Sequence, residues 1–235
     1  LLSLADGVDR EIDGTEEGSH PFFSPDGQSV GFSTGNELKR VELSGGVPRS
    51  LVSDLNLGGR GASWGTNGIV YARAIADGLW KIDSEGGQAE SLTKPEPGEQ
   101  THRWPQWLPD GKHVLFMVGA IGNPGAVGGE VQVVEVASGK PRILIKGVSF
   151  ARYVVSGHLL FVQDDSLWAQ EVDLDEMKLK GKPTLVRQGT RVNSRGVAQY
   201  SVSEEGTLAY FSGTGGGLRK FVWVGLDGKT IDANG

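Results

Sequence analysis

The chain has 235 residues, a formal net charge of −6, 37 glycines and no cysteine. The lack of cysteine excludes disulfides and thiolate chemistry, and the acidic balance argues against a nucleic-acid partner. No apolar run approaches the ~20 residues that a membrane-spanning helix needs, so we expect no membrane insertion in this segment. These features together indicate a turn-rich β-protein.

A tight turn that ends in glycine recurs along the chain, with a short apolar segment on each side. In the first turn, Ser24-Pro25-Asp26-Gly27, proline fixes φ, aspartate can bond back to the backbone and glycine takes a positive φ. Equivalent turn glycines follow at intervals of 41, 43, 46 and 49 residues, at Gly68, Gly111, Gly157 and Gly206. Each turn predicts a β-hairpin. The second strand of every hairpin carries one aromatic residue: Phe32, Tyr71, Phe116, Phe161 or Tyr210.

Two further strands are predicted after each hairpin. The third strands are expected over Glu37–Leu43, Leu79–Asp83, Glu130–Val136, Leu167–Asp173 and Phe221–Leu226. The fourth strands are more polar and are expected over Arg49–Val52, Ala89–Leu92, Arg142–Ile145, Thr184–Val186 and Lys229–Asp232. Four antiparallel strands in each repeat of ~40–50 residues are typical of a β-propeller blade.

We therefore predict an all-β fold, with one β-propeller domain of four-stranded antiparallel blades over residues 1–235. Five complete blades are expected, at approximately 20–54, 60–94, 102–146, 151–190 and 197–233. An N-terminal half-blade over residues 1–13 then points to a six-bladed parent. Such a set of blades leaves open edges, through which two copies of the chain could associate.

The residues of the first repeat also carry a family resemblance. The segment from His20 to Gly27, followed by Ser29-Val30-Gly31-Phe32, and the related Trp107-Leu108-Pro109-Asp110-Gly111 resemble the WD40-like repeat of TolB-type propellers. The stretch from Tyr200 to Lys229 is similar to propeller domains attached to bacterial membrane serine/threonine kinases. This resemblance implies an extracytoplasmic, periplasmic module with a sensor or scaffold role.

One segment matches a hydrolase motif. Gly61-Ala62-Ser63-Trp64-Gly65 fits G-x-S-x-G, which requires a strand, a sharp turn and then a helix. A hairpin is predicted here instead, so we expect Ser63 to be a structural residue of a first strand.

The predicted first strands also argue against catalysis. None of them contains Asp or Glu, whereas a glycosidase needs two carboxyl groups. They cover Pro21–Ser24, Ala62–Trp64, Pro105–Leu108, Tyr153–Val155 and Tyr200–Val202. The four histidines and the short acidic runs lack the spacing of a metal site. We therefore expect no catalytic residue, no metal and no cofactor.

Cationic residues recur where the chain enters the first strand of each blade. They are His20, Arg60, His102, Arg103, Arg152, Arg191 and Arg195. In a propeller, these positions surround one mouth of the central channel. The side chains could bond to carbonyls or acids of neighbouring blades, or they could form a mouth that binds a carboxylate, a phosphate or an acidic peptide end.

We thus predict a non-enzymatic binding, sensor or scaffold module of the TolB-like type, which recognises a protein or a small anionic ligand at the channel mouth. The alternative is an accessory, gating propeller of a larger enzyme such as a serine peptidase. Flanking sequence would discriminate the two, because a kinase with a membrane span favours a sensor and a hydrolase domain favours the alternative.

Overall fold

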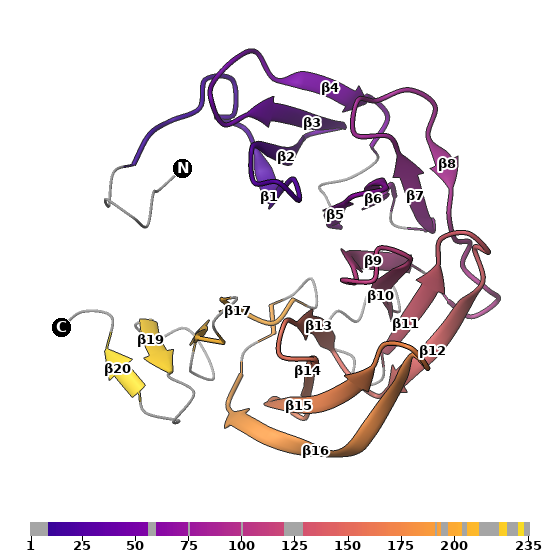
Figure 1. Ribbon diagram of the computed structural model, residues 1–235, viewed down its shortest axis with the longest axis vertical. Coiled ribbons are helices and arrows are strands. Elements are labelled where there is room, and N and C mark those ends of the chain that lie inside the picture. Colours follow the sequence, from indigo (N-terminus) through magenta and orange to yellow (C-terminus); the bar gives the residue numbers. More distant parts are fainter. Residues whose placement is uncertain are drawn as a thin grey trace. The chain divides into compact units, whose positions relative to one another are not determined.

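The computed structural model describes residues 9–55, 60–74, 76–99, 101–119, 129–190, 192–193, 197–203, 206–211, 221–224 and 230–232. The regular secondary structure of these residues is β-strand (Figure 1). They form no α-helix, and so they contain none long and apolar enough to cross a membrane. The chain divides into two compact units, residues 1–112 and 113–235.

The first unit contains nine of the described strands. They are β1 (Ser19–Phe23), β2 (Ser29–Thr34), β3 (Glu37–Glu42), β4 (Arg49–Val52), β5 (Ala62–Gly65), β6 (Gly68–Ala72), β7 (Leu79–Ile82), β8 (Glu90–Ser91) and β9 (Thr101–Trp107).

The described strands of the second unit follow in the same manner. They are β10 (His113–Gly119), β11 (Glu130–Glu135), β12 (Pro141–Lys146), β13 (Phe150–Val154), β14 (His158–Gln163), β15 (Ser166–Asp173), β16 (Lys178–Gln188), β17 (Tyr200–Val202), β18 (Leu208–Phe211), β19 (Phe221–Val224) and β20 (Thr230–Asp232).

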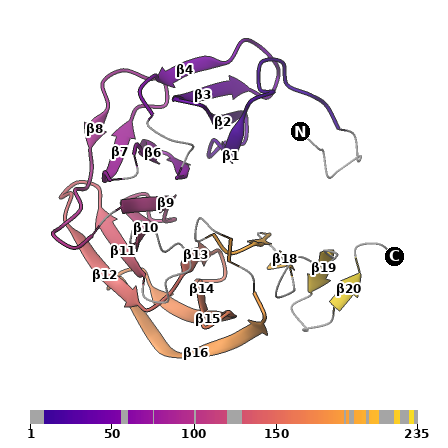
Figure 2. The same ribbon diagram turned by 180° about the vertical axis from the view of Figure 1, so that it is seen from behind.

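Hydrogen bonds join these strands into sheets of four in which sheet order follows chain order. The sheets are β1–β4, β5–β8, β9–β12, β13–β16 and β17–β20, and the same order can be followed from behind in Figure 2. The pairings within these sheets are antiparallel. The all-β class and the five four-stranded repeats predicted from the turn spacing are therefore confirmed.

The turn glycines explain why the hairpins recur. Each of the five predicted positions has a φ between 63° and 107°, a region that costs other residues about 1–2 kcal/mol. In the first turn, the Asp26 carboxylate accepts hydrogen bonds from the Ser24 hydroxyl at 2.5 Å and the Gln28 amide at 3.0 Å. The same two bonds lower the pKa of Asp26, so this carboxylate has the structural role expected for it.

The core of the first unit lies between its first two sheets. Buried apolar side chains from both sheets form it: Leu38, Leu51, Val52, Leu55, Ile69, Tyr71 and Ile82. Phe22 reaches this core by lying over Gly31, where an added Cβ would be 2.2 Å from the Phe22 ring. Phe22 then meets Trp64 edge to face, with ring centroids 6.3 Å apart. One face of the first sheet is thereby fixed against the second sheet.

In the second unit, the predicted aromatic positions Phe116, Phe161 and Tyr210 are each at most 2% exposed. The fourth strand of the β13–β16 sheet is much longer than the predicted segment Thr184–Val186, because β16 pairs along the length of β15 with two register shifts. Most side chains of β16 are exposed, so this strand has no apolar pattern by which the sequence could reveal it.

The N-terminal half-blade is not tested as a whole, because residues 1–8 lie outside the described residues. Residues 10–18 contain no strand and follow a series of turns. The guanidinium of Arg10 donates to the Leu43 carbonyl at 2.6 Å, and the Gly18 amide donates to the Thr15 carbonyl at 2.8 Å. This segment therefore lies against the first sheet.

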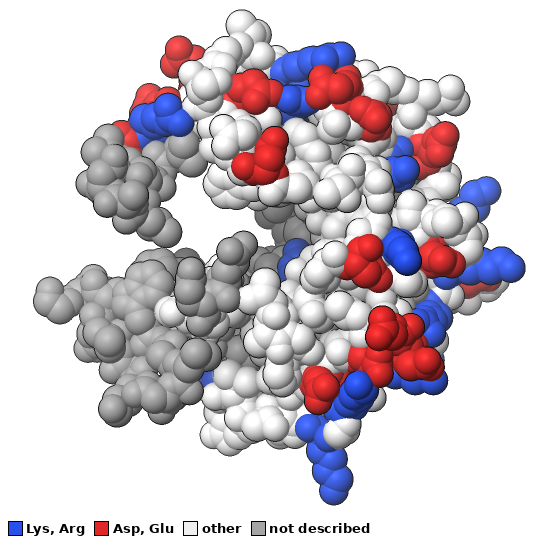
Figure 3. Space-filling view, in the orientation of Figure 1, with Lys and Arg blue, Asp and Glu red and all other residues white. Residues whose placement is uncertain are grey.

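Acidic and basic side chains are interspersed over the outer strands on the face shown in Figure 3. Lys146 pairs with Glu130 at 2.7 Å, and Lys180 pairs with Asp173 at 2.9 Å. Surface ion pairs of this kind contribute little to the free energy of unfolding, about 0–1 kcal/mol each. On this face, charges of both signs are mixed among the described residues.

Candidate anion-binding site at the first strands

The backbone takes a left-handed conformation at the same position of three successive repeats. His20 has φ 53°, Gly61 has φ 89° and Trp104 has φ 55°. Positions 20, 61 and 104 are separated by the same 41 and 43 residues that separate the first three turn glycines. A residue other than glycine is strained in this backbone conformation, and such strain is concentrated at functional sites.

The residues at these three positions lie close together within the first unit. The rings of His20 and Trp104 have centroids 5.8 Å apart with a tilt of 39°. Trp104 also covers Gly61, where an added Cβ would lie 2.8 Å from the Trp104 ring. The Trp104 amide donates to the Arg60 carbonyl at 2.7 Å. One buried indole thus connects the starts of β1, β5 and β9.

Two arginines lie next to these left-handed positions in the chain. Arg60 directly precedes Gly61, and Arg103 directly precedes Trp104 and is 6% exposed. Burial lowers the pKa of Arg103, and the positive charge of Arg60 lowers it further. Two cations that repel each other at a partly desolvated place are stabilised by an anion. We call His20, Arg60, Arg103 and Trp104 the cationic cluster.

His102 lies in β9 beside this cluster and is fully buried. Its ring nitrogens contact the Thr93 hydroxyl at 2.7 Å and the Glu99 carboxylate at 3.1 Å. Burial lowers the pKa of His102, although the hydrogen bond to Glu99 acts in the opposite direction. Because these contacts engage both ring nitrogens, we leave His102 out of the cationic cluster.

The trio of hydroxyl, imidazole and carboxylate has the composition of a catalytic triad. Thr93, however, is 2% exposed, and its hydroxyl oxygen accepts the Leu79 amide at 2.9 Å. A nucleophile must be able to reach a substrate. The geometry therefore supports a structural role in which the trio ties β7 to the start of β9.

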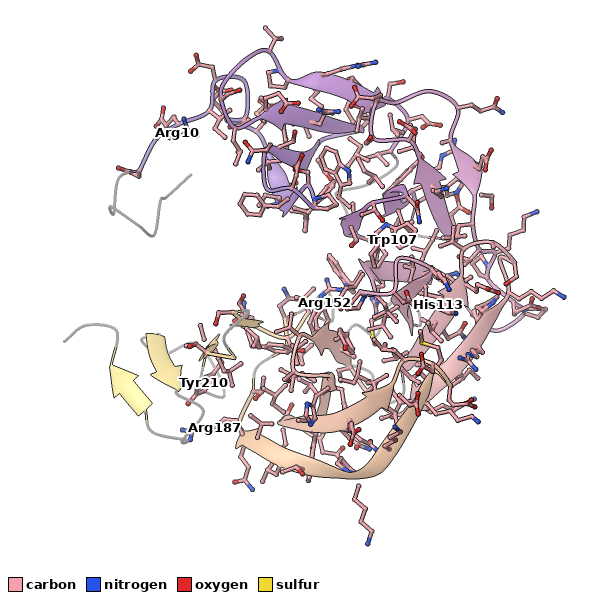
Figure 4. All side chains as sticks on the ribbon, in the orientation of Figure 1. Arg10, Trp107, His113, Arg152, Arg187 and Tyr210 are labelled. Carbon is pink, nitrogen blue, oxygen red and sulfur yellow. The ribbon has the colours of Figure 1, made fainter. Side chains whose placement is uncertain are left out.

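The remaining predicted cations belong to the second unit. Arg152 lies in β13, and its guanidinium is 5.1 Å from the centroid of the Phe150 ring (Figure 4). Burial lowers the pKa of Arg152, and Tyr200 acts to raise it. The Tyr200 hydroxyl donates to the Leu160 carbonyl at 3.2 Å, and burial raises the pKa of this phenol. Arg191 and Arg195 lie outside the described residues.

Ser63 lies in β5, as expected for a first strand, and a hairpin to β6 follows it. Its hydroxyl accepts a hydrogen bond from the Trp107 amide at 3.0 Å. The Trp107 indole donates a hydrogen bond to the Gly68 carbonyl at 3.1 Å. Ser63 therefore links β5 to β9 within the first unit.

Trp104 was not among the site residues predicted from the sequence. A signal for it exists, because Trp104-Pro105 repeats His20-Pro21 at the spacing of the turn glycines. A residue before proline is normally extended, so sequence reasoning alone gives no ground for a left-handed conformation there. Among the described residues, no three His, Asp or Glu side chains converge as a metal site would require.

No protein-family model matches the chain, and no curated protein matches its sequence. Solved structures do match its fold. A putative TolB from Agrobacterium tumefaciens matches with a TM-score of 0.66 and 15% identity over 92% of this chain and 79% of that chain. The calcium-binding protein regucalcin from the same bacterium matches with a TM-score of 0.63 and 19% identity over 91% of this chain and 72% of that chain. Nidogen, in a complex with laminin, matches with a TM-score of 0.63 and 14% identity over 90% of this chain and 77% of that chain.

Identities this low establish the fold alone. The matched structures include enzymes, such as a luciferin-regenerating enzyme and a gluconolactonase, as well as the nidogen of the laminin complex. A propeller fold therefore leaves the function open. The chain has an all-β fold that matches six-bladed β-propellers, TolB among them.

Proposed function

We propose that this chain is a non-enzymatic binding module of the TolB-like propeller type, and that the cationic cluster binds its anionic ligand. The observation that carries this proposal is that Arg60 and Arg103 directly precede the left-handed positions Gly61 and Trp104, where the Trp104 ring lies 5.8 Å from the His20 ring. The ligand class is a carboxylate, a phosphate or the acidic end of a protein partner.

The chemistry of the cluster suits such a ligand. A guanidinium presents paired N–H donors that match the two oxygens of a carboxylate or a phosphate. The buried position of Arg103 reduces screening by water and salt, so each charged hydrogen bond is stronger there than on the surface.

The composition of the first strands supports a binding role over a catalytic one. None of β1, β5, β9, β13 and β17 contains Asp or Glu. The Ser63 hydroxyl accepts a hydrogen bond from the Trp107 amide, and Thr93 and His102 are buried and hydrogen-bonded to each other. A general base beside an accessible nucleophile is missing from these groups.

Two features support the remaining parts of the proposal. The similarity of residues 200–229 to propellers attached to bacterial membrane kinases supports an extracytoplasmic role. In this role, the anionic ligand would be the acidic end of a protein. Open sheet edges, where they are present, would let two copies of the chain associate.

Isothermal titration calorimetry with sodium sulfate, citrate and a hexaglutamate peptide tests the proposal. We expect at least one probe to bind, and Arg60→Ala to weaken that binding about tenfold or more, the value of a charged hydrogen bond. Arg49→Ala is the matched control, because Arg49 is exposed on β4 and pairs with Glu85 at 3.3 Å. Equal binding by the two variants, or no binding of any probe, would overturn the proposal.

A further inference from the structure

A cavity of about 610 Å³ lies on the face of the first sheet that is turned away from the core. Its floor contains a row of apolar residues in register across three strands, in which Phe23 pairs with Val30 and Val30 pairs with Val41. Phe22, the neighbour of Phe23, occupies the core side of the same sheet. Phe23 is 56% exposed and Val41 is buried, so Phe23 presents most of the apolar surface of this row to the cavity.

The wall of the cavity is the turn segment of residues 9–18, which is fixed to the first sheet at three points. Arg10 donates to the Leu43 carbonyl at 2.6 Å. At Gly14, an added Cβ would lie 2.9 Å from the Pro48 ring, and at Gly18 it would lie 3.1 Å from the Phe32 ring. Close packing at both glycines makes this wall a defined part of the fold.

The charges around the cavity are mainly negative. Asp9, Glu11 and Glu16 line it, and Arg10 is the cation among its described lining residues. The Arg10 guanidinium is engaged by the Leu43 carbonyl. Backbone amides of Glu16 and Gly14 lower the pKa of Glu16, so this carboxylate is ionised at neutral pH.

We propose that this cavity binds a small organic cation with an apolar body, such as a hydrophobic amine. Its volume falls within the roughly 300–1,000 Å³ of small-molecule sites. Phe23 and Val30 would cover the apolar body, and the carboxylates of Glu11 and Glu16 would attract the charged group. This site uses residues distinct from the cationic cluster, and it selects the opposite charge.

Three probes of one shape test the inference: phenylbutylamine, phenylbutanol and phenylbutyrate, titrated into the full chain and followed by calorimetry. We expect the amine to bind more tightly than the alcohol, and the alcohol more tightly than the carboxylate. Glu11→Gln and Glu16→Gln should each weaken amine binding about twofold to fivefold, as expected for partly screened charges. Glu90→Gln, on the exposed β8 of the second sheet, is the control that should leave binding unchanged.

Phe23→Ser tests the apolar floor without threatening the core, because Phe23 is already half exposed. It should weaken all three probes by about tenfold, provided that circular dichroism shows a folded chain. Equal affinity for amine and carboxylate, or binding unchanged by Phe23→Ser, would overturn the proposal, and so would a failure of the amine to bind at millimolar concentration. Since sulfate binding at Arg60 is measured separately, the two proposals fail independently.

Discussion

His20 and Trp104 hold equivalent positions in two different sheets, and both take a left-handed backbone conformation that places their rings 5.8 Å apart. Residues other than glycine rarely adopt this conformation, because it costs about 1–2 kcal/mol for each. Both residues precede a proline, Pro21 or Pro105, which adds a further restriction. Packing around the ring pair must offset this strain, and Arg103 directly precedes Trp104 in this pair.

A substitution at Gly61 measures how closely the Trp104 ring packs against the backbone there. Gly61→Ala should destabilise the chain by about 1–3 kcal/mol more than Gly27→Ala, because only the first variant drives a methyl group into the Trp104 ring. Gly27 also has a positive φ, but it has no heavy atom within 4 Å of an added Cβ. Urea denaturation of both variants measures the difference, and equal losses would show that Trp104 yields to the new methyl group.

The fold could be predicted from the sequence because the residue types of each turn determine its backbone conformation. The five turn glycines have positive φ, and the second-strand aromatics, such as Phe116 and Phe161, are buried. The site could be predicted only in part. Arg60 and Arg103 stand out as cations at repeated positions, whereas the role of Trp104 depends on a backbone conformation that contradicts the usual preference before proline.

The length of β16 shows a second limit of sequence reasoning. Its side chains are mostly exposed, and its pairing with β15 contains two register shifts. Alternating hydrophobicity reveals a strand only when one of its faces is buried. An outer strand whose side chains are mostly exposed leaves no such pattern.

Ser63 provides a test of the proposal that the chain is not an enzyme. A fluorophosphonate probe should fail to label it, because its hydroxyl accepts the Trp107 amide and lies on a strand followed by a hairpin. Intact-mass spectrometry after incubation measures the outcome, with a known serine hydrolase as the positive control. Stoichiometric labelling at Ser63 would contradict the proposal.

His102 should make stability depend on pH. Burial lowers its pKa below the ordinary value of 6.5, so the unfolded chain takes up a proton at a pH where the folded chain does not. Protons therefore favour unfolding, and the free energy of unfolding should fall as the pH drops below about 6.5 and level off below the folded-state pKa.

Chemical denaturation between pH 7.5 and pH 5, as a rough working range, measures this dependence. His102→Gln should lower stability at neutral pH by about 1–3 kcal/mol, because it disturbs buried hydrogen bonds, and it should flatten the profile in this range. An unchanged slope in the variant would assign the pH dependence to another group.

Arg187 and Tyr210 connect β16 to β18, which belong to neighbouring sheets of the second unit (Figure 4). The guanidinium lies 5.3 Å from the centroid of the phenol ring, within the range of a cation–π contact. A double-mutant cycle with Arg187→Gln and Tyr210→Leu should give a coupling energy of about 0.5–1 kcal/mol. The same cycle with Arg142→Gln should give no coupling beyond error, and equal values would refute a specific contact.

The most direct measurement for the central claim is a crystal structure of the chain soaked in selenate, an anion whose selenium atom gives an anomalous signal. The account predicts an anomalous peak within hydrogen-bond distance of the Arg60 and Arg103 guanidinium groups, beside the Trp104 ring, and loss of that peak in Arg60→Ala crystals. Selenate bound only at other surface cations, with the cationic cluster empty in the same crystals, would contradict the proposed function.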